Sequence, residues 1–136
     1  MKTLEQIYLD ILLEGKYDNE TWIQYDTYKG IELYVRRDGH LQRRLKERYS
    51  GLSQAMTKAF IVIKKLIKEE LKNPKSILVV NDKSEFSFTV VGEDSGICLS
   101  GRFKKNAGEW RCCISTALPS EDAHHSGNDI FRIVKA

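Results

Sequence analysis

The strongest constraint on the fold is a change of hydrophobic pattern at Asn73-Pro74. Before this pair, apolar side chains recur every three or four residues, as they do on the buried face of a helix. These residues are Met56, Ala59, Phe60, Ile63, Leu66, Ile67 and Leu71. Ser53 is placed as an N-cap, and Pro74 restricts the residue before it, so a helix is predicted between them.

After Pro74 the chain consists of short runs rich in β-branched and aromatic residues, separated by turn residues. We expect strands at Ser76–Val80, Glu85–Val91, Ile97–Phe103, Trp110–Leu118 and Ile130–Val134. Most connections between these runs are too short for a helical crossover and suit antiparallel hairpins. The second half of the chain is therefore predicted to be an antiparallel meander.

Four segments precede the long helix. Residues 3–14 have helical spacing and stop at Gly15, whereas residues 16–29 show no clean period and fit a short helix or irregular cover. Gly30–Arg37 alternates like a strand, and a helix is expected from His40 to a break at Ser50-Gly51. The predicted fold class is α+β, with N-terminal helices packed on a four- to five-stranded antiparallel sheet.

Length and composition describe one globular unit without a membrane segment. The chain has 136 residues, of which 41% are hydrophobic and 30% charged, as expected for a single folded domain. The longest apolar runs, such as Ala59–Ile63, are far shorter than the roughly 20 residues that cross a bilayer. The N-terminus lacks the pattern of a secretory signal, and no membrane partner is expected.

Positive charge is concentrated in the middle of the chain. Residues 36–72 hold eleven Lys or Arg against four acidic residues, a net charge of +7, whereas residues 1–35 carry −4. A basic segment of this kind is typical of a protein that binds a polyanion, and it is equally typical of a helix surface exposed to solvent. The three cysteines Cys98, Cys112 and Cys113 have no zinc-site spacing, so we expect reduced thiols in a cytosolic compartment and neither metal nor cofactor.

One possible catalytic group is a stripe on the expected helix after Gly39. His40, Arg44 and Arg48 follow at four-residue steps and would share one side of that helix, with Arg43 on its flank. A near-neutral histidine can take the proton of a ribose 2′-hydroxyl, while arginines hold the charge that gathers on phosphorus. The alternative is a histidine at a helix N-terminus beside solvent-facing arginines.

Further residues could take part in the same chemistry. His124 and His125 could supply a second proton, or they are simply exposed loop histidines. Basic side chains and Trp110 on the expected sheet could bind the phosphates and stack the unpaired bases of RNA. The alternative is an exposed Lys-rich turn in which Trp110 anchors the sheet. Thr116 could add a hydroxyl donor. The remaining residues of this substrate-binding set are Arg102, Lys104, Lys105, Trp110 and Arg111.

The stretch His40-Leu41-Gln42-Arg43-Arg44-Leu45-Lys46-Glu47-Arg48, placed ahead of Ser50-Gly51, resembles a motif of the RelE and barnase/EndoU/colicin-like RNases. The phage mRNA endoribonucleases of the RegB type are most similar. The resemblance implies a RelE-like fold in which His40 and Arg44 are catalytic. It also implies single-stranded mRNA as substrate, and it leaves open a toxin-like module held by an antitoxin.

A second resemblance concerns the N-terminus. Met1-Lys2-Thr3 and the later Leu12-Leu13-Glu14-Gly15 are similar to the capsid-targeting peptides of T-even-type phage internal head proteins. The resemblance implies cleavage between Glu14 and Gly15, a single domain over residues 15–136, packaging in the phage head and release into the host cytoplasm. The alternative is a plain first helix that ends at Gly15.

The sequence thus predicts a metal-independent endoribonuclease that cleaves RNA by 2′-hydroxyl transesterification. The alternative is a phage internal head protein that binds and inhibits a host defence enzyme without catalysis.

Overall fold

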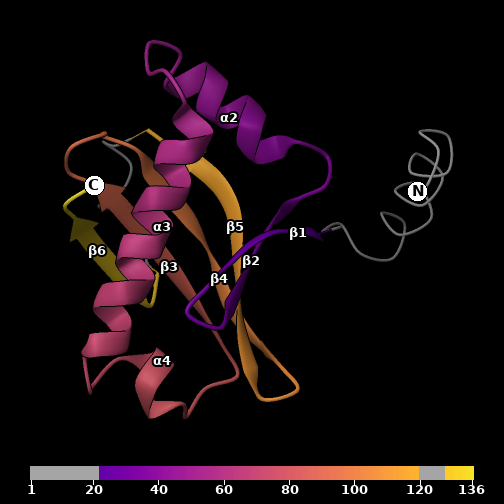
Figure 1. The fold of residues 1–136 in the computed structure, drawn as a ribbon, viewed down its shortest axis with the longest axis vertical. Coiled ribbons are helices and arrows are strands. Elements are labelled where there is room, and N and C mark those ends of the chain that lie inside the picture. Colours follow the sequence, from indigo (N-terminus) through magenta and orange to yellow (C-terminus); the bar gives the residue numbers. More distant parts are fainter. Residues whose placement is uncertain (1–21, 120–127) are drawn as a thin grey trace, which may run out of the picture.

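The computed structural model describes residues 22–119 and 128–136, which form one curved, mixed sheet of six strands with helices on one side (Figure 1). The strands are β1 (Trp22–Tyr28), β2 (Ile31–Arg36), β3 (Glu85–Gly92), β4 (Cys98–Asn106), β5 (Glu109–Leu118) and β6 (Ile130–Val134). The helices are α2 (His40–Arg48), α3 (Ala55–Lys72) and α4 (Ile77–Val80).

The strand order β1-β2-β5-β4-β3-β6 joins two antiparallel units side by side. The β1–β2 hairpin turns at Lys29-Gly30, and β4 meets β5 at Ala107-Gly108; all four residues have positive φ angles, as a two-residue turn that follows the strand twist requires. β2 lies parallel to β5, and β6 lies parallel to β3. Two parallel junctions therefore flank a three-stranded antiparallel meander.

The predicted fold class is wrong, and so is the RelE-like arrangement that the resemblance implied. The described chain begins with two strands instead of helices, and its sheet has six strands in mixed orientation. The expected helix over residues 3–14 lies outside the described residues. The long connection through α2 and α3 allows β2 to pair in parallel with a distant strand, so β2 extends the meander.

Two local predictions also fail. Residues 22–28, within a segment expected to be a helix or cover, form β1, whose register shifts between Gln24 and Asp26 and hides the strand period. Ser76–Val80 is not a strand, because the Ser76 hydroxyl accepts the Leu78 N–H and caps the short helix α4. The other four runs do form strands, and β2 occupies the predicted range 30–37.

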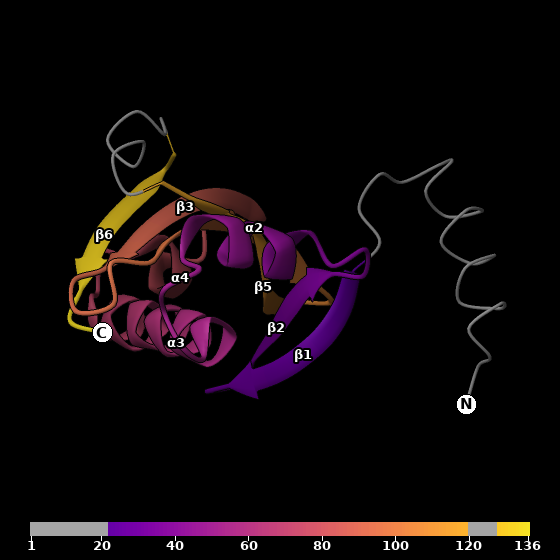
Figure 2. The same ribbon diagram turned by 90° about the horizontal axis from the view of Figure 1, so that it is seen from above.

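The long helix is confirmed, although not its cap. α3 ends at Lys72 before Asn73-Pro74, but it begins at Ala55 after Gln54, whose φ is 56°, and no side chain caps it. α3 lies within the concave side of the curved sheet, with α2 and α4 on the same side (Figure 2). Its apolar stripe meets the inward side chains of the strands in one core that includes Leu33, Phe88 and Phe103.

Close packing in this core requires a glycine at one position. A Cβ atom on Gly101 would lie 2.1 Å from the Cys113 carbonyl oxygen and 2.9 Å from the Phe88 ring. Both distances are shorter than real contacts permit, so the missing side chain lets β4 approach the Phe88 ring and β5 at this point.

A buried carboxylate connects α3 to the edge strand β6. Glu70 is only 2% exposed; it accepts from Arg132 Nε at 3.0 Å and from the Ser76 hydroxyl at 3.4 Å. A buried charge needs such partners, so this group ties α3, the α4 cap and β6 together.

Candidate functional site

The candidate site lies on the outer face of the sheet, the face turned away from α3. Arg111, Cys113 and Thr116 on β5 pair with Lys104, Arg102 and Ser100 on β4. These β4 partners are spaced by two, so their side chains share one face. The irregularity at Ser115 absorbs the odd residue on β5 and thereby places Thr116 on the same face as Arg111.

At one end of this face, His40 meets Thr116. His40 Nε2 lies 3.1 Å from Thr116 Oγ1, although the two residues are 76 positions apart in the chain. α2 packs against β5 by its buried residues Leu41 and Leu45, which fixes the first turn of the helix above Thr116. The structure therefore brings together two residues that the sequence analysis selected independently.

The loop before α2 fixes the position of His40. Asp38 Oδ1 accepts the backbone N–H of His40 at 2.9 Å, while Asp38 Oδ2 pairs with Arg36 at 2.7 Å. Gly39 has a φ of 77°, a left-handed conformation that glycine adopts without steric penalty. The segment Arg36 to His40 is thus a tight turn that carries an arginine and a histidine to the same end of the sheet.

The surroundings of His40 favour its neutral form. Partial burial lowers the pKa of His40 below its usual value of 6.5, and the positive charges of Arg36 and Arg44 lower it further, against a smaller opposing effect of Asp38. A neutral imidazole near pH 7 can accept a proton. Both arginines also form ion pairs, Arg36 with Asp38 and Arg44 with Glu47.

The middle of the outer face combines an aromatic ring with a well-held arginine. The Arg111 guanidinium lies 5.2 Å from the centre of the Tyr34 ring, and its Nε donates to Glu32 Oε1 at 3.0 Å. The Tyr34 hydroxyl donates to the same oxygen at 3.2 Å. The pKa of Tyr34 is raised, chiefly by burial, so the phenol keeps its proton.

Several predicted residues lie on this face or beside it. Arg102 is exposed and pairs with Glu85, and Lys104 is half-buried opposite Arg111. On α2, Arg44 pairs with Glu47 at 2.9 Å, while Arg43 and Arg48 are exposed. The arginine stripe therefore exists beside His40, with one member engaged in an exposed ion pair.

Two predicted binding residues are engaged in packing contacts. Trp110 is 9% exposed and packs edge-on against Phe86 at 5.2 Å between ring centres. Lys105 lies 5.0 Å from the centre of the Trp110 ring and donates to the Asn81 carbonyl at 3.1 Å. The structure gives both side chains a packing role, as in the alternative that the sequence left open.

Other predicted residues fall outside the described part of the chain: His124 and His125, and Glu14 and Gly15 at the expected cleavage point. Conversely, Tyr34, Arg36 and Asp38 were not among the residues predicted from the sequence. A signal for them existed, because Glu32, Tyr34 and Arg36 alternate with the apolar residues of the predicted strand. The strand that pairs with this one could not be predicted from the sequence.

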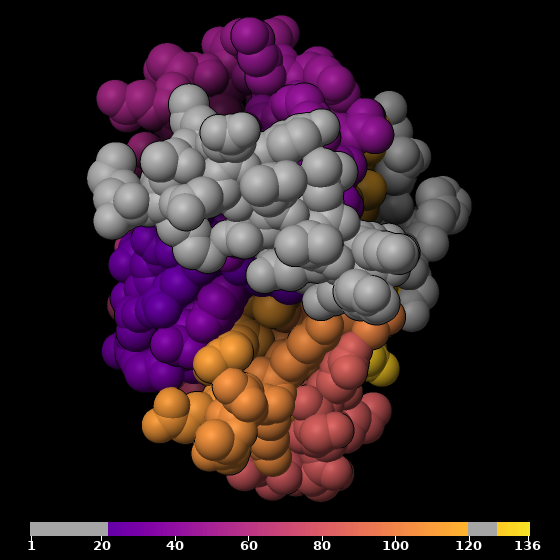
Figure 3. Space-filling model, turned by 90° about the vertical axis from the view of Figure 1, so that its right-hand side faces the viewer, coloured from indigo at the N-terminus to yellow at the C-terminus, as the bar shows by residue number. Residues whose placement is uncertain are grey.

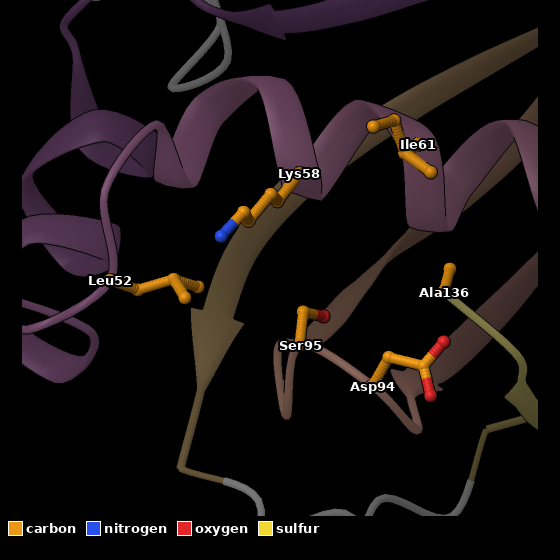
Figure 4. Close-up of a pocket in the computed structure, with 6 residues that line it drawn as sticks. All are labelled: Leu52, Lys58, Ile61, Asp94, Ser95 and Ala136. Atoms are coloured by element: carbon orange, nitrogen blue, oxygen red, sulfur yellow. The ribbon is translucent and has the colours of Figure 1, made fainter.

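A more apolar cavity lies elsewhere, between the start of α3 and the β3–β4 loop, and measures about 280 Å³. It is lined by Leu52, Lys58, Ile61, Asp94, Ser95 and Ala136 (Figure 4). It holds no histidine, cysteine or arginine, so the chemistry described above does not extend to it.

Compared with known proteins, the chain matched no family model, no curated protein and no solved structure. Within residues 22–119 and 128–136, no helix has the length and apolar character that a membrane crossing demands. No group of three or more His, Cys, Asp or Glu side chains in that same part could hold a metal ion.

Proposed function

We propose that the protein is a metal-independent endoribonuclease in which His40 accepts the proton of the ribose 2′-hydroxyl. The observation that carries the proposal is the 3.1 Å contact between His40 Nε2 and Thr116 Oγ1 at the end of a basic sheet face. A neutral imidazole, a hydroxyl and several arginines in one place are the groups that phosphodiester transesterification uses.

These groups can carry out the bond changes and the first proton transfer of RNA cleavage. The 2′-oxygen attacks phosphorus as its proton passes to His40, and the bond from phosphorus to the 5′-oxygen breaks. The products are a 2′,3′-cyclic phosphate and a 5′-hydroxyl. The leaving oxygen takes a proton from a second acid, for which His124 and His125 remain the sequence-based candidates. Arg36 and Arg44, whose charges already act on His40, would stabilise the phosphorane.

The test is incubation of purified protein with end-labelled single-stranded RNA in EDTA, followed by end-group analysis. We expect cyclic-phosphate ends with the wild type, a loss of at least 100-fold in rate with His40→Ala, and a smaller loss with Thr116→Val. Lys46→Gln is the matched control, because Lys46 is exposed on the same helix and has no role in the proposed step.

Folding of each variant is checked by circular dichroism, since a variant that unfolds says nothing about chemistry. Normal cleavage by folded His40→Ala would contradict the role of His40. Absence of cleavage by the folded wild type would overturn the enzyme proposal and favour the alternative, an injected head protein that inhibits a host enzyme. Mass spectrometry of virions would then establish packaging and the expected start at Gly15.

A further inference from the structure

We propose that a pocket on the outer face, about 13 Å along the sheet from the His40–Thr116 pair, binds an unpaired nucleobase of the RNA strand. This inference rests on the proposed function, because it names how that same site would hold its substrate. The pocket measures about 190 Å³ and is lined by Trp22, Tyr34, Lys104, Lys105, Asn106, Arg111 and Cys113. Four strands, β1, β2, β4 and β5, contribute to it.

The place of the pocket follows from the strand pairing. Tyr34 on β2 is paired with Cys113 on β5, and Trp22 on β1 is paired with Arg36 on β2. In the space-filling view, the indigo surface of β1 and β2 and the orange surface of β4 and β5 border a hollow (Figure 3). Among the described residues, the pocket is therefore a depression between the hairpin and the meander.

The groups in the pocket suit a flat, aromatic ligand attached to phosphate. The guanidinium of Arg111 lies over Tyr34 and is oriented by Glu32, and a layered arginine and tyrosine form a rigid stacking platform. In the amide orientation that satisfies both groups, the Asn106 oxygen accepts from the two terminal nitrogens of Arg111 at 3.1 and 2.6 Å. Arg111 is thus held on three sides before any ligand arrives.

Size and charge narrow the class of ligand. The volume is below the about 300–1,000 Å³ of pockets for drug-sized ligands, so one ring system fits better than a whole dinucleotide. Lys104, which lines the pocket, supplies a positive charge for the phosphate attached to the base. Bases of single-stranded RNA commonly stack on aromatic rings and on arginine planes beside such cations.

The pocket and the histidine can act on one strand. Lys104 and Ser100 are four residues apart on β4, and Ser100 is paired with Thr116, so Lys104 and the His40–Thr116 pair are separated by about 13 Å. Stacked nucleotides advance about 3.4 Å each, so a strand of about four nucleotides spans this distance. A base in the pocket would therefore place a phosphate about four nucleotides along the strand at His40.

The experiment measures binding separately from cleavage. Fluorescein-labelled 2′-O-methyl RNA hexamers, which lack the attacking hydroxyl, are titrated with wild-type protein and followed by fluorescence anisotropy. A hexamer of the same backbone without bases is titrated beside them. We expect the wild type to bind the complete hexamer about tenfold more tightly than the abasic one.

Variants at Tyr34 and Arg111 test whether the pocket causes this preference. Tyr34→Ala should lose the tenfold preference, whereas Tyr34→Phe, which keeps the ring, should retain it. Arg111→Lys keeps the charge but loses the planar fork; it should weaken the preference, and it replaces Tyr34→Ala if that variant fails to fold. Lys72→Gln, an exposed lysine at the end of α3, is the control for loss of a charge.

Each outcome decides between the two proposals. An equal preference in wild type and Tyr34→Ala, or no preference in the wild type, would overturn the nucleobase pocket, even if RNA is cleaved. A preference that depends on Tyr34 without any cleavage would support the pocket and overturn the endoribonuclease. Binding of both hexamers with equal affinity would indicate a site for phosphate alone.

Discussion

The two faces of the sheet are held by different interactions, although they are made by the same strands. On β2, Ile31, Leu33 and Val35 point inward and are at most 5% exposed. Glu32, Tyr34 and Arg36 point outward: Glu32 accepts from the Tyr34 hydroxyl and pairs with Arg111, and Arg36 pairs with Asp38. The inner face therefore depends on burial of apolar area, and the outer face on polar contacts at a partly hydrated surface.

This difference separates stability from function along each strand. Burial of a large apolar side chain contributes several kcal/mol, whereas an exposed ion pair contributes at most about 1 kcal/mol. Substitutions on the outer face should consequently change ligand binding with little effect on folding. Substitutions on the inner face should do the reverse, and four predictions test this comparison.

The largest expected effect is on the inner face. Phe88 is fully buried and packs against Phe103 at 5.2 Å between ring centres. Phe88→Ala should lower the free energy of unfolding by about 4 kcal/mol, measured by urea denaturation. Ile61→Ala is the control, because Ile61 is apolar but 51% exposed on α3. Equal losses in the two variants would contradict the position of the core.

A smaller loss is expected for the polar group on the helix side. Glu70→Gln keeps the shape but removes the charge that Arg132 meets at 3.0 Å, and should cost about 2 kcal/mol. Glu69→Gln, half-buried on the same helix, should change little. If Glu70→Gln were as stable as the wild type, β6 would not depend on this contact.

The pH dependence of stability tests the outer face. Because the pKa of His40 is lower in the folded chain than its usual 6.5, the unfolded chain binds the proton more readily. Stability should therefore fall as the pH drops through 6.5 towards the folded pKa. His40→Gln should show a weaker fall between pH 7.5 and pH 5, measured as the thermal midpoint. An identical slope in both proteins would contradict the lowered pKa.

The smallest effect is expected at an exposed ion pair. Arg102 and Glu85 pair across β4 and β3 with side chains 57% and 44% exposed. Arg102→Gln should change the free energy of unfolding by less than about 0.5 kcal/mol while weakening RNA binding and its dependence on salt. A loss of stability comparable to that of Glu70→Gln would remove the distinction between the two faces.

The sequence predicted the elements better than their arrangement. α3, β2 and the four strands from β3 to β6 were visible, because their periodicity is a local property of the chain. β1 was not recognised, since its register shift breaks the alternation. Ser76–Val80 was mistaken for a strand because a four-residue apolar run has no distinguishing period, and the capping hydroxyl of Ser76 decides its conformation.

The arrangement of strands depended on non-local pairing, which no local pattern records. The parallel junction of β2 with β5 joins residues about as far apart as Glu32 and Arg111. The same limit applies to the site: His40 and Thr116 were each selected from the sequence, but their contact was not foreseeable. Trp110 was expected as a binding residue, and burial against Phe86 gives it a different role.

The parallel junction between β2 and β5 also has a kinetic consequence. The β1–β2 hairpin and the β3–β4–β5 meander each contain only contacts between neighbours in the chain, whereas the junction closes a loop of dozens of residues. Such long loops close slowly, since their entropy must be lost before native contacts form. The groups around His40 and Thr116 lie across this seam, so they come together only when the two halves of the sheet dock.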